Sequence, residues 1–312
     1  MTSLSKCLLF PIDGTEEALR PIEFLQRLYP NRDRIGLVLC YFAQALPPAF
    51  REQRGSQEQL KKKQELLKSR EQAIRSAFEG AKKVLVAKGF QSDLIHEHVL
   101  EKQASKAKDA CLLADWKKAD AVLIRKRVTT TLAGLFEDDP TDALLRHCLT
   151  SPLWLVEGTT DVSQAAICIT DEEASLRAAD HAAFMLTGTH TTVTLLHAAR
   201  NISQPLRSDA AAVSSELERW FATSEGRPVK PFLKESYEHL KREGILDGSI
   251  RSAIIPSQRK AAFEILDYCR RQGIGILVLG HTPPTGITGF LKGSVTKKAI
   301  AELRNMTLWI NQ

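Results

Sequence analysis

The residues best suited to hold a ligand lie between Gly280 and Ser294, in the stretch GHTPPTGITGFLKGS. An apolar run, residues 274–279, precedes this stretch, and residues 295–303 after it have the pattern of a helix. A strand, a glycine-bearing loop and a helix start can together cradle a phosphate, because the first turn of a helix leaves backbone N–H groups unpaired. The alternative is a glycine-rich loop that only joins a strand to a helix.

Five residues of this stretch and its flank are candidates for phosphate contact. Gly293 lets the backbone approach a ligand, and the Ser294 hydroxyl can cap the helix or bond a phosphate. Val295 begins the helix and offers a backbone N–H at the same place. His281 could donate a hydrogen bond or simply be solvated, and Lys292 could balance phosphate charge or be an ordinary surface lysine. The spacing fits neither the P-loop nor G-x-G-x-x-G.

The elements that must position this loop belong to a repeat that spans the chain. Asp13 recurs as Asp171, and Trp154 in PLWLV recurs as Trp309 in TLWIN, at an offset of roughly 155 to 158 residues. An offset of this length indicates a duplicated domain and not a short-period solenoid. We expect one domain over residues 1–158 and a second over residues 159–312, joined by the polar, turn-rich residues 157–164.

Each half alternates short apolar runs with helical patterns, which predicts an α/β fold. The order implies a doubly wound, Rossmann-like domain with a five-stranded, mostly parallel sheet and helices on both faces. The expected strands are residues 6–12, 35–42, 92–100, 121–124, 152–156, 165–170, 192–198, 250–255, 274–279 and 307–311. The expected helices are residues 16–28, 48–88, 107–118, 141–149, 174–186, 208–222, 229–243, 258–272 and 295–303.

Composition narrows the function classes. The chain has 312 residues, a net charge of +6 and a pI near 9.0, without a basic tract interleaved with aromatic residues, so we expect no nucleic-acid partner. It has no apolar run of 18 residues and no signal-peptide pattern, so we expect a cytoplasmic protein without a membrane partner. Its six cysteines show no C-x-x-C pairing, so we expect buried, reduced thiols.

An Asp after the first strand, together with the loop spacing after the fourth, resembles the universal stress protein family in its tandem-domain form. The family pattern is G-x2-G-x9-G-[ST], and Gly280, Gly293 and Ser294 match three of its four positions. The second glycine is replaced by Pro283, which has no N–H to offer a phosphate. The resemblance implies an adenine nucleotide alpha hydrolase-like fold that binds ATP or another adenine nucleotide, with Mg²⁺ as a candidate companion ion.

The same resemblance assigns two further contacts in the second half. Asp171 would bond the base or ribose, although an Asp at this place can also cap the helix that follows. Ala198, at the end of the second strand of this half, would place its backbone against adenine. Pairing of the last strands, either between the two halves or in a homodimer, is also implied, with Trp154 and Trp309 as candidates for that contact or for core.

The first half departs from the pattern. Arg125 stands at the position of Gly280, and Asp138-Asp139 stand where Gly293-Ser294 would be. Two carboxylates repel a triphosphate, although Lys126 and Arg127 could partly offset them. We therefore expect a degenerate first domain that serves as scaffold or as the surface for an unidentified regulatory protein partner.

No catalytic residue and no metal site stand out. His96 and His98 would share one face of a strand, but the sequence offers no third ligand beside them. Three functions stay open: a stress-response regulator that binds an adenine nucleotide, an interaction protein of the same fold that binds none, and a slow ATP hydrolase. Calorimetry with ATP and Mg²⁺ separates the first two, and ADP release separates the third.

Overall fold

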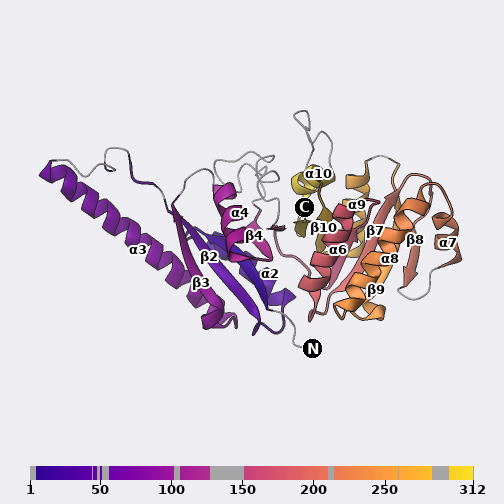
Figure 1. Ribbon diagram of the computed structural model, residues 1–312, viewed down its shortest axis with the longest axis horizontal. Helices are drawn as coiled ribbons and strands as arrows, with labels where there is room; N and C mark the ends of the chain where they lie inside the picture. The colour runs from indigo at the N-terminus through magenta and orange to yellow at the C-terminus, as the bar shows by residue number, and fades with distance from the viewer. Residues whose placement is uncertain are drawn as a thin grey trace.

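The computed structural model describes residues 5–43, 45–47, 50, 56–101, 106–126, 151–209, 214–258, 260–282 and 295–311. Its strands form one sheet with the order β3-β2-β1-β4-β5-β11-β10-β6-β7-β9-β8. The first half of the chain supplies one end of this sheet and the second half supplies the other, as Figure 1 shows. The expected α/β fold of two doubly wound halves is confirmed.

The elements follow the alternation of the sequence. The strands are β1 Lys6–Ile12, β2 Ile35–Ala43, β3 Ile95–Glu101, β4 Ala121–Arg125, β5 Leu153–Val156, β6 Gln164–Cys168, β7 Thr192–Ala199, β8 Leu206–Asp209, β9 Ile250–Pro256, β10 Ile276–Gly280 and β11 Thr307–Asn311. The α-helices are α1 Glu16–Leu19, α2 Pro21–Leu28, α3 Gln57–Ala87, α4 Lys106–Lys117, α6 Glu173–Leu186, α7 Ser215–Phe221, α8 Gly226–Arg242, α9 Ala261–Gln272 and α10 Val295–Glu302. Two short 3-10 turns, η2 Ser92–Leu94 and η4 Asp247–Ser249, precede β3 and β9.

The two halves are joined by their last strands. β5 pairs with β4 in parallel and with β11 in antiparallel orientation, and Trp154 faces Trp309 in that ladder. Both indoles are fully buried, and they stack with 3.8 Å between ring centroids and 2° between planes. The expected pairing within one chain is therefore present, and the two tryptophans are at once interface and core.

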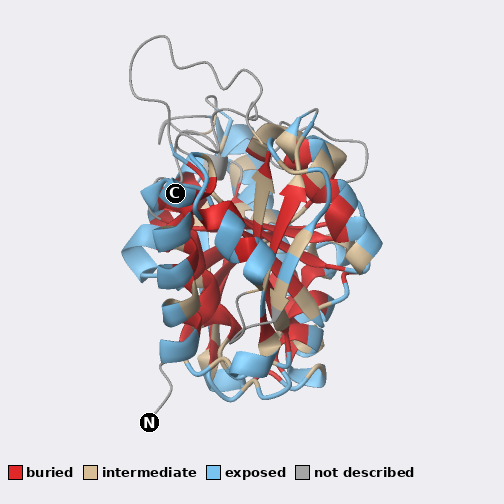
Figure 2. Ribbon diagram, turned by 90° about the vertical axis from the view of Figure 1, so that its right-hand side faces the viewer, coloured by how far each residue is buried: buried red, intermediate tan, exposed pale blue. Residues whose placement is uncertain are grey.

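The helices cover both faces of the sheet. One hydrophobic cluster combines one sheet face with α2, α3, α6, α7 and α8, and a second combines the opposite face with α4, α9 and α10. Each cluster contains strand residues from both halves, so the core is continuous across the β5–β11 junction. Figure 2 shows the buried residues gathered along the sheet, between the exposed outer sides of the helices.

Three elements differ from the expectation. The helix expected over residues 16–28 is broken into α1 and α2, because Pro21 lacks the N–H that would continue the first helix. The helix expected over residues 208–222 is reduced to α7, and a sixth strand, β8, lies antiparallel to β9 at the edge. The helix expected over residues 48–88 begins only at Gln57, with Ser56 as its cap, and α3 extends beyond the sheet (Figure 1). The helix expected over residues 141–149 lies outside the described residues.

The cysteines follow the expectation in part. Cys7, Cys40, Cys168 and Cys269 are free, and burial raises the pKa of each thiol. Cys111 is disulfide-bonded, contrary to the expectation of reduced thiols throughout. Its position in α4, without a C-x-x-C neighbour, gave no sequence signal for a disulfide.

Candidate functional site at the carboxyl ends of the strands

The predicted site residues of the second half meet at one edge of the sheet. β6 lies between β10 and β7, and all three strands are parallel, so their carboxyl ends share that edge. Asp171 follows β6, Ala198 lies near the end of β7, and Gly280 ends β10. The chain moves to opposite sides of β6 in its two crossovers, which makes the gap between β6 and β10 a topological switch point, where open α/β sheets bind ligands.

Asp171 is exposed at this edge and begins an acidic run, Asp171-Glu172-Glu173. The helix N-cap is Glu172 and not Asp171, and no side chain caps the first turn of α6. The alternative role of Asp171 as a helix cap is therefore wrong. Glu172 instead accepts a hydrogen bond from Thr282 Oγ1 at 3.1 Å, which links the start of α6 to the residue that follows His281.

Gly280 permits a close approach between α6 and β10. A Cβ on Gly280 would lie 2.2 Å from the Ala174 carbonyl oxygen and 2.7 Å from the Ser175 nitrogen. These are backbone atoms of the first turn of α6, so they cannot rotate away. Gly280, expected to let a ligand approach the backbone, thus also lets α6 pack closely against β10. The loop spacing alone did not indicate this contact.

We expect Gly280→Ala to destabilise the fold by about 1–3 kcal/mol, since the added methyl must displace the first turn of α6. Urea unfolding monitored by circular dichroism measures the change. Gly248→Ala is the matched control, because nothing lies within 4 Å of a Cβ at Gly248. Equal unfolding midpoints for the two variants would show that α6 does not constrain Gly280.

His281 is buried, with 4% of its surface exposed. Its backbone N–H donates to the Asn311 carbonyl at 2.7 Å, and its Nδ1 lies 3.5 Å from Thr296 Oγ1 in the first turn of α10. Burial lowers the pKa of His281, so the ring is neutral near pH 7. Among the described residues its Nε2 has no hydrogen-bond partner. His281 therefore ties β10 to α10, and it is not the solvated loop histidine of the alternative interpretation.

The end of β7 is held by its own contacts. Ala198 is partly buried on the face of the sheet covered by α9 and α10. His197 beside it hydrogen-bonds the Ile169 carbonyl at 2.7 Å and packs against Trp220. Glu225 accepts hydrogen bonds from the backbone N–H groups that follow β7, at Arg200 and Asn201. These contacts fix the backbone around Ala198.

The rest of the predicted loop lies outside the described residues, namely Pro283, Lys292, Gly293 and Ser294. After this segment, α10 begins at Val295. Val295 is partly buried and packs against the cluster under α9 and α10. The end of β10 and the start of α10 are thus placed, on either side of the undescribed segment.

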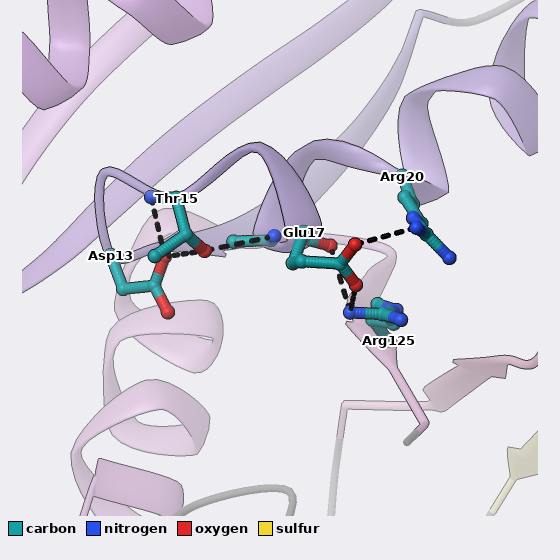
Figure 3. A network of polar contacts seen from close by, with 6 residues as sticks. Asp13, Thr15, Glu17, Arg20 and Arg125 are labelled. Atoms are coloured by element: carbon teal, nitrogen blue, oxygen red, sulfur yellow. Dashed lines mark hydrogen bonds and ion pairs between the residues drawn. The ribbon is translucent and has the colours of Figure 1, made fainter. Parts of the chain in front are cut away.

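At the corresponding edge of the first half, polar side chains contact one another, as Figure 3 shows. Arg125, at the end of β4, forms an ion pair with the Glu17 carboxylate and also donates to the Glu17 carbonyl at 3.4 Å. Arg20 pairs with the same carboxylate at 2.5 Å. Asp13 accepts hydrogen bonds from the Thr15 backbone and hydroxyl at 2.9 and 2.6 Å, and Thr15 caps α1.

These contacts distinguish the two halves. The switch point of the first half lies between β1 and β4, and the Arg125–Glu17 pair spans it. Lys126, considered above as a counter-charge in the first half, is buried with 2% of its surface exposed, and its pKa is lowered by burial and by Arg304. Arg127 and Asp138-Asp139 lie outside the described residues. The sequence showed Arg125 in place of a glycine but gave no signal for its partner, which lies 108 residues earlier.

Among the described residues no three His, Cys, Asp or Glu side chains are grouped to hold a metal ion. His96 is exposed, and the His98 ring instead packs edge-on against Trp116, with centroids 5.4 Å apart. Within the described ranges, no helix combines the length and apolar character needed to cross a bilayer.

The fold and this edge define a doubly wound α/β protein built from two like halves. A family model described as the universal stress protein family matches the chain twice, over residues 5–156 and 164–309. The chain therefore belongs to the universal stress protein family, as a tandem member.

Solved structures agree with this assignment. A universal stress protein from Archaeoglobus fulgidus DSM 4304 is similar over 99% of this chain and 98% of its own, with a TM-score of 0.62 and 10% identity. A functionally unknown protein from Pseudomonas aeruginosa PAO1 is similar over 98% and 92%, with a TM-score of 0.52 and 12% identity. A universal stress protein solved in complex with cAMP covers 48% of this chain and 95% of its own, with a TM-score of 0.31 and 17% identity. The first two likenesses show the fold, and no curated protein matches the chain.

Proposed function

We propose that the second half binds an adenine nucleotide, ATP above others, at the edge where β6, β7 and β10 end. The observation that supports this most is that Asp171, Ala198 and Gly280 lie at one edge of the sheet, at or next to the switch point between β6 and β10. The start of α10 follows 15 residues after Gly280 in the chain. A helix start of this kind offers backbone N–H groups to a phosphate. The first half then serves as scaffold and as the surface for a regulatory protein partner.

The proposed binding requires Mg²⁺. Asp171, Glu172 and Glu173 are exposed beside the site, and three carboxylates repel a free triphosphate. A magnesium ion carried by the nucleotide removes part of that repulsion, since Mg²⁺ in such sites is held chiefly by substrate phosphates and a few carboxylates. Binding of ATP should therefore weaken when Mg²⁺ is chelated, more than the binding of AMP does.

The nucleotide would act as a regulatory ligand. A ligand shifts a conformational equilibrium only by its difference in affinity for the two states. Contacts from the phosphates to residues 293–295 and from the base to β7 would favour one arrangement of the second half, and the partner would bind that arrangement. The scaffold alternative rests on Pro283 and on the tight packing of Gly280 against α6, both of which reduce the backbone available to a ligand.

Titration calorimetry of the full chain tests the proposal, with ATP, ADP, AMP and cAMP, each with and without Mg²⁺. We expect saturable binding of Mg-ATP to the wild type and at least a tenfold weaker affinity in Gly293→Asp, because the new carboxylate would stand beside the phosphates. Gly248→Asp carries the same change just before β9, at the edge of the sheet where the parallel strands of the second half begin, and should bind as the wild type does. If no heat is measured at millimolar nucleotide, the proposal is refuted and the scaffold function is favoured. If the wild type releases more ADP from ATP than Gly293→Asp does, the slow ATP hydrolase function is favoured.

A further inference from the structure

A cavity lies on the face of the sheet that α9 covers, towards the amino ends of the strands of the second half. Its volume is about 140 Å³. Gln164 begins β6, Thr194 and Arg251 lie near the starts of β7 and β9, and Tyr268 comes from α9. The nucleotide edge proposed above is at the opposite ends of these strands, so the two sites are separate.

Strand register brings the polar residues of the cavity together. Thr194 faces Arg251 in the β7–β9 ladder, and their neighbours Val193 and Ile250 pack into the cluster on the α8 face. Because side chains alternate along a strand, Thr194 and Arg251 point to the α9 face. Arg207 pairs with Ala253 in the β8–β9 ladder, and Ala253 belongs to the cluster on the α9 face. The antiparallel edge strand β8 thus adds a second arginine to this face.

The two arginines converge on Tyr268. The guanidinium carbon of Arg207 lies 5.9 Å from the centroid of the Tyr268 ring. Burial raises the pKa of Tyr268, while Arg207 and Arg251 both act to lower it, which places both guanidinium groups within electrostatic reach of the hydroxyl. The floor of the cavity is buried, since Thr194, Ala253 and Tyr268 are each less than one-tenth exposed.

The chemistry of the lining favours an anion. The described lining residues contain two arginines and no carboxylate. The remaining polar groups are hydroxyls and amides from tyrosine, threonine, serine and glutamine, which can donate hydrogen bonds to oxygen. Guanidinium groups are suited to oxyanions, because their planar array of donors matches the oxygens of a phosphate or carboxylate.

The size of the cavity limits the ligand. Pockets for drug-sized molecules have volumes of about 300–1,000 Å³. A cavity of about 140 Å³ is smaller than this, and it suits a single phosphate or a short carboxylate better than a nucleotide. We propose that the cavity between Arg207, Arg251 and Tyr268 binds a small oxyanion, independently of the nucleotide site.

Inorganic phosphate and succinate, each titrated into the full chain at constant ionic strength, test this inference. The readout is the ligand-dependent rise in Tm, which reports binding to the native state whatever the starting stability of each variant. We expect at least one of the two anions to raise the Tm of the wild type, and the anion that does so identifies the ligand class. The Kd expected for the anion is roughly 1 mM. If neither anion raises the Tm at a concentration about 50 times this Kd, the proposal is overturned.

Substitutions locate the binding. Arg207→Gln should weaken binding at least tenfold, and Tyr268→Phe should weaken it less, because the ring that supports Arg207 remains. Arg75→Gln is the matched control, because it removes the same charge from an exposed position on α3, where Arg75 pairs with Glu71 at 3.8 Å. An equal response in Arg207→Gln and Arg75→Gln would assign the effect to general charge and refute the site.

One more variant separates this cavity from the nucleotide loop. Gly293→Asp should leave the phosphate response intact, whereas loss of that response would move the anion to the nucleotide loop.

Discussion

Trp309→Ala is expected to lower the free energy of unfolding by about 3–5 kcal/mol, the range measured when a buried tryptophan is truncated to alanine. Trp309 is fully buried and stacks on Trp154 across the β5–β11 ladder, so the substitution opens a cavity where the two halves meet. Chemical unfolding of the full chain measures the loss. Trp116→Ala is the control, because Trp116 is 68% exposed and its truncation should change stability by less than about 1 kcal/mol.

Substitution by phenylalanine separates the hydrogen bond from the packing. Trp154 Nε1 donates to His181 Nε2 at 3.1 Å, whereas Trp309 Nε1 has no partner among the described residues. Trp154→Phe and Trp309→Phe remove the same volume from one stack, but only the first leaves His181 without its donor. Trp154→Phe should therefore be the less stable by about 1–2 kcal/mol. Equal stabilities would mean that the His181 contact contributes nothing.

Acid should destabilise the protein through His181. The ring lies edge-on to both stacked indoles, with centroids 5.9 and 6.0 Å away, and removal from water lowers its pKa to about 3. An unfolded chain takes up the proton near pH 6.5, so between these pH values the unfolded state binds more protons than the native state. The stability associated with the neutral ring is thus complete above about pH 6.5 and is lost as the pH falls.

The expected loss between pH 7 and pH 4.5 is about 2–3 kcal/mol, from 1.36 kcal/mol for each pH unit below the unfolded pKa. His181→Gln keeps an acceptor for Trp154 but does not titrate, so its stability should fall less steeply over this range. His197 and His281, whose pKa values burial also lowers, contribute equally to both proteins. His190→Gln, at an exposed position, is the control. Parallel stability–pH curves for the wild type and His181→Gln would contradict this account.

The fold could be predicted because its strands are short apolar runs bounded by Asp, Gly and polar residues. The repeat of Asp13 as Asp171 and of Trp154 as Trp309 indicated the duplication. The family model, which matches the chain twice, agrees with it. β8 was missed because Leu206–Asp209 has a single apolar residue. An edge strand of this kind is specified by its pairing with β9, not by its own pattern. The break before α2 had a local signal in Pro21.

The site could be predicted only as far as local spacing reaches. The order of the strands placed Asp171, Ala198 and Gly280 at one edge, since parallel strands of a doubly wound sheet end together. The spacing could not show that Gly280 is packed against Ala174, because that contact spans more than 100 residues of sequence. For the same reason the Arg125–Glu17 pair and the cavity beside Arg207 appeared only with the fold. Both features depend on which strands lie side by side and in which register, and the sequence alone does not specify this.

Because β5 and β11 pair inside a single polypeptide, the two halves always meet in a one-to-one ratio and always as unlike neighbours. A homodimer of identical subunits would repeat every change in both members. Here the first half has an Arg125–Glu17 ion pair where β1 and β4 end, while the second half has Asp171 and Gly280 at the corresponding edge. Covalent linkage therefore lets the two halves of one sheet carry different residues at corresponding positions.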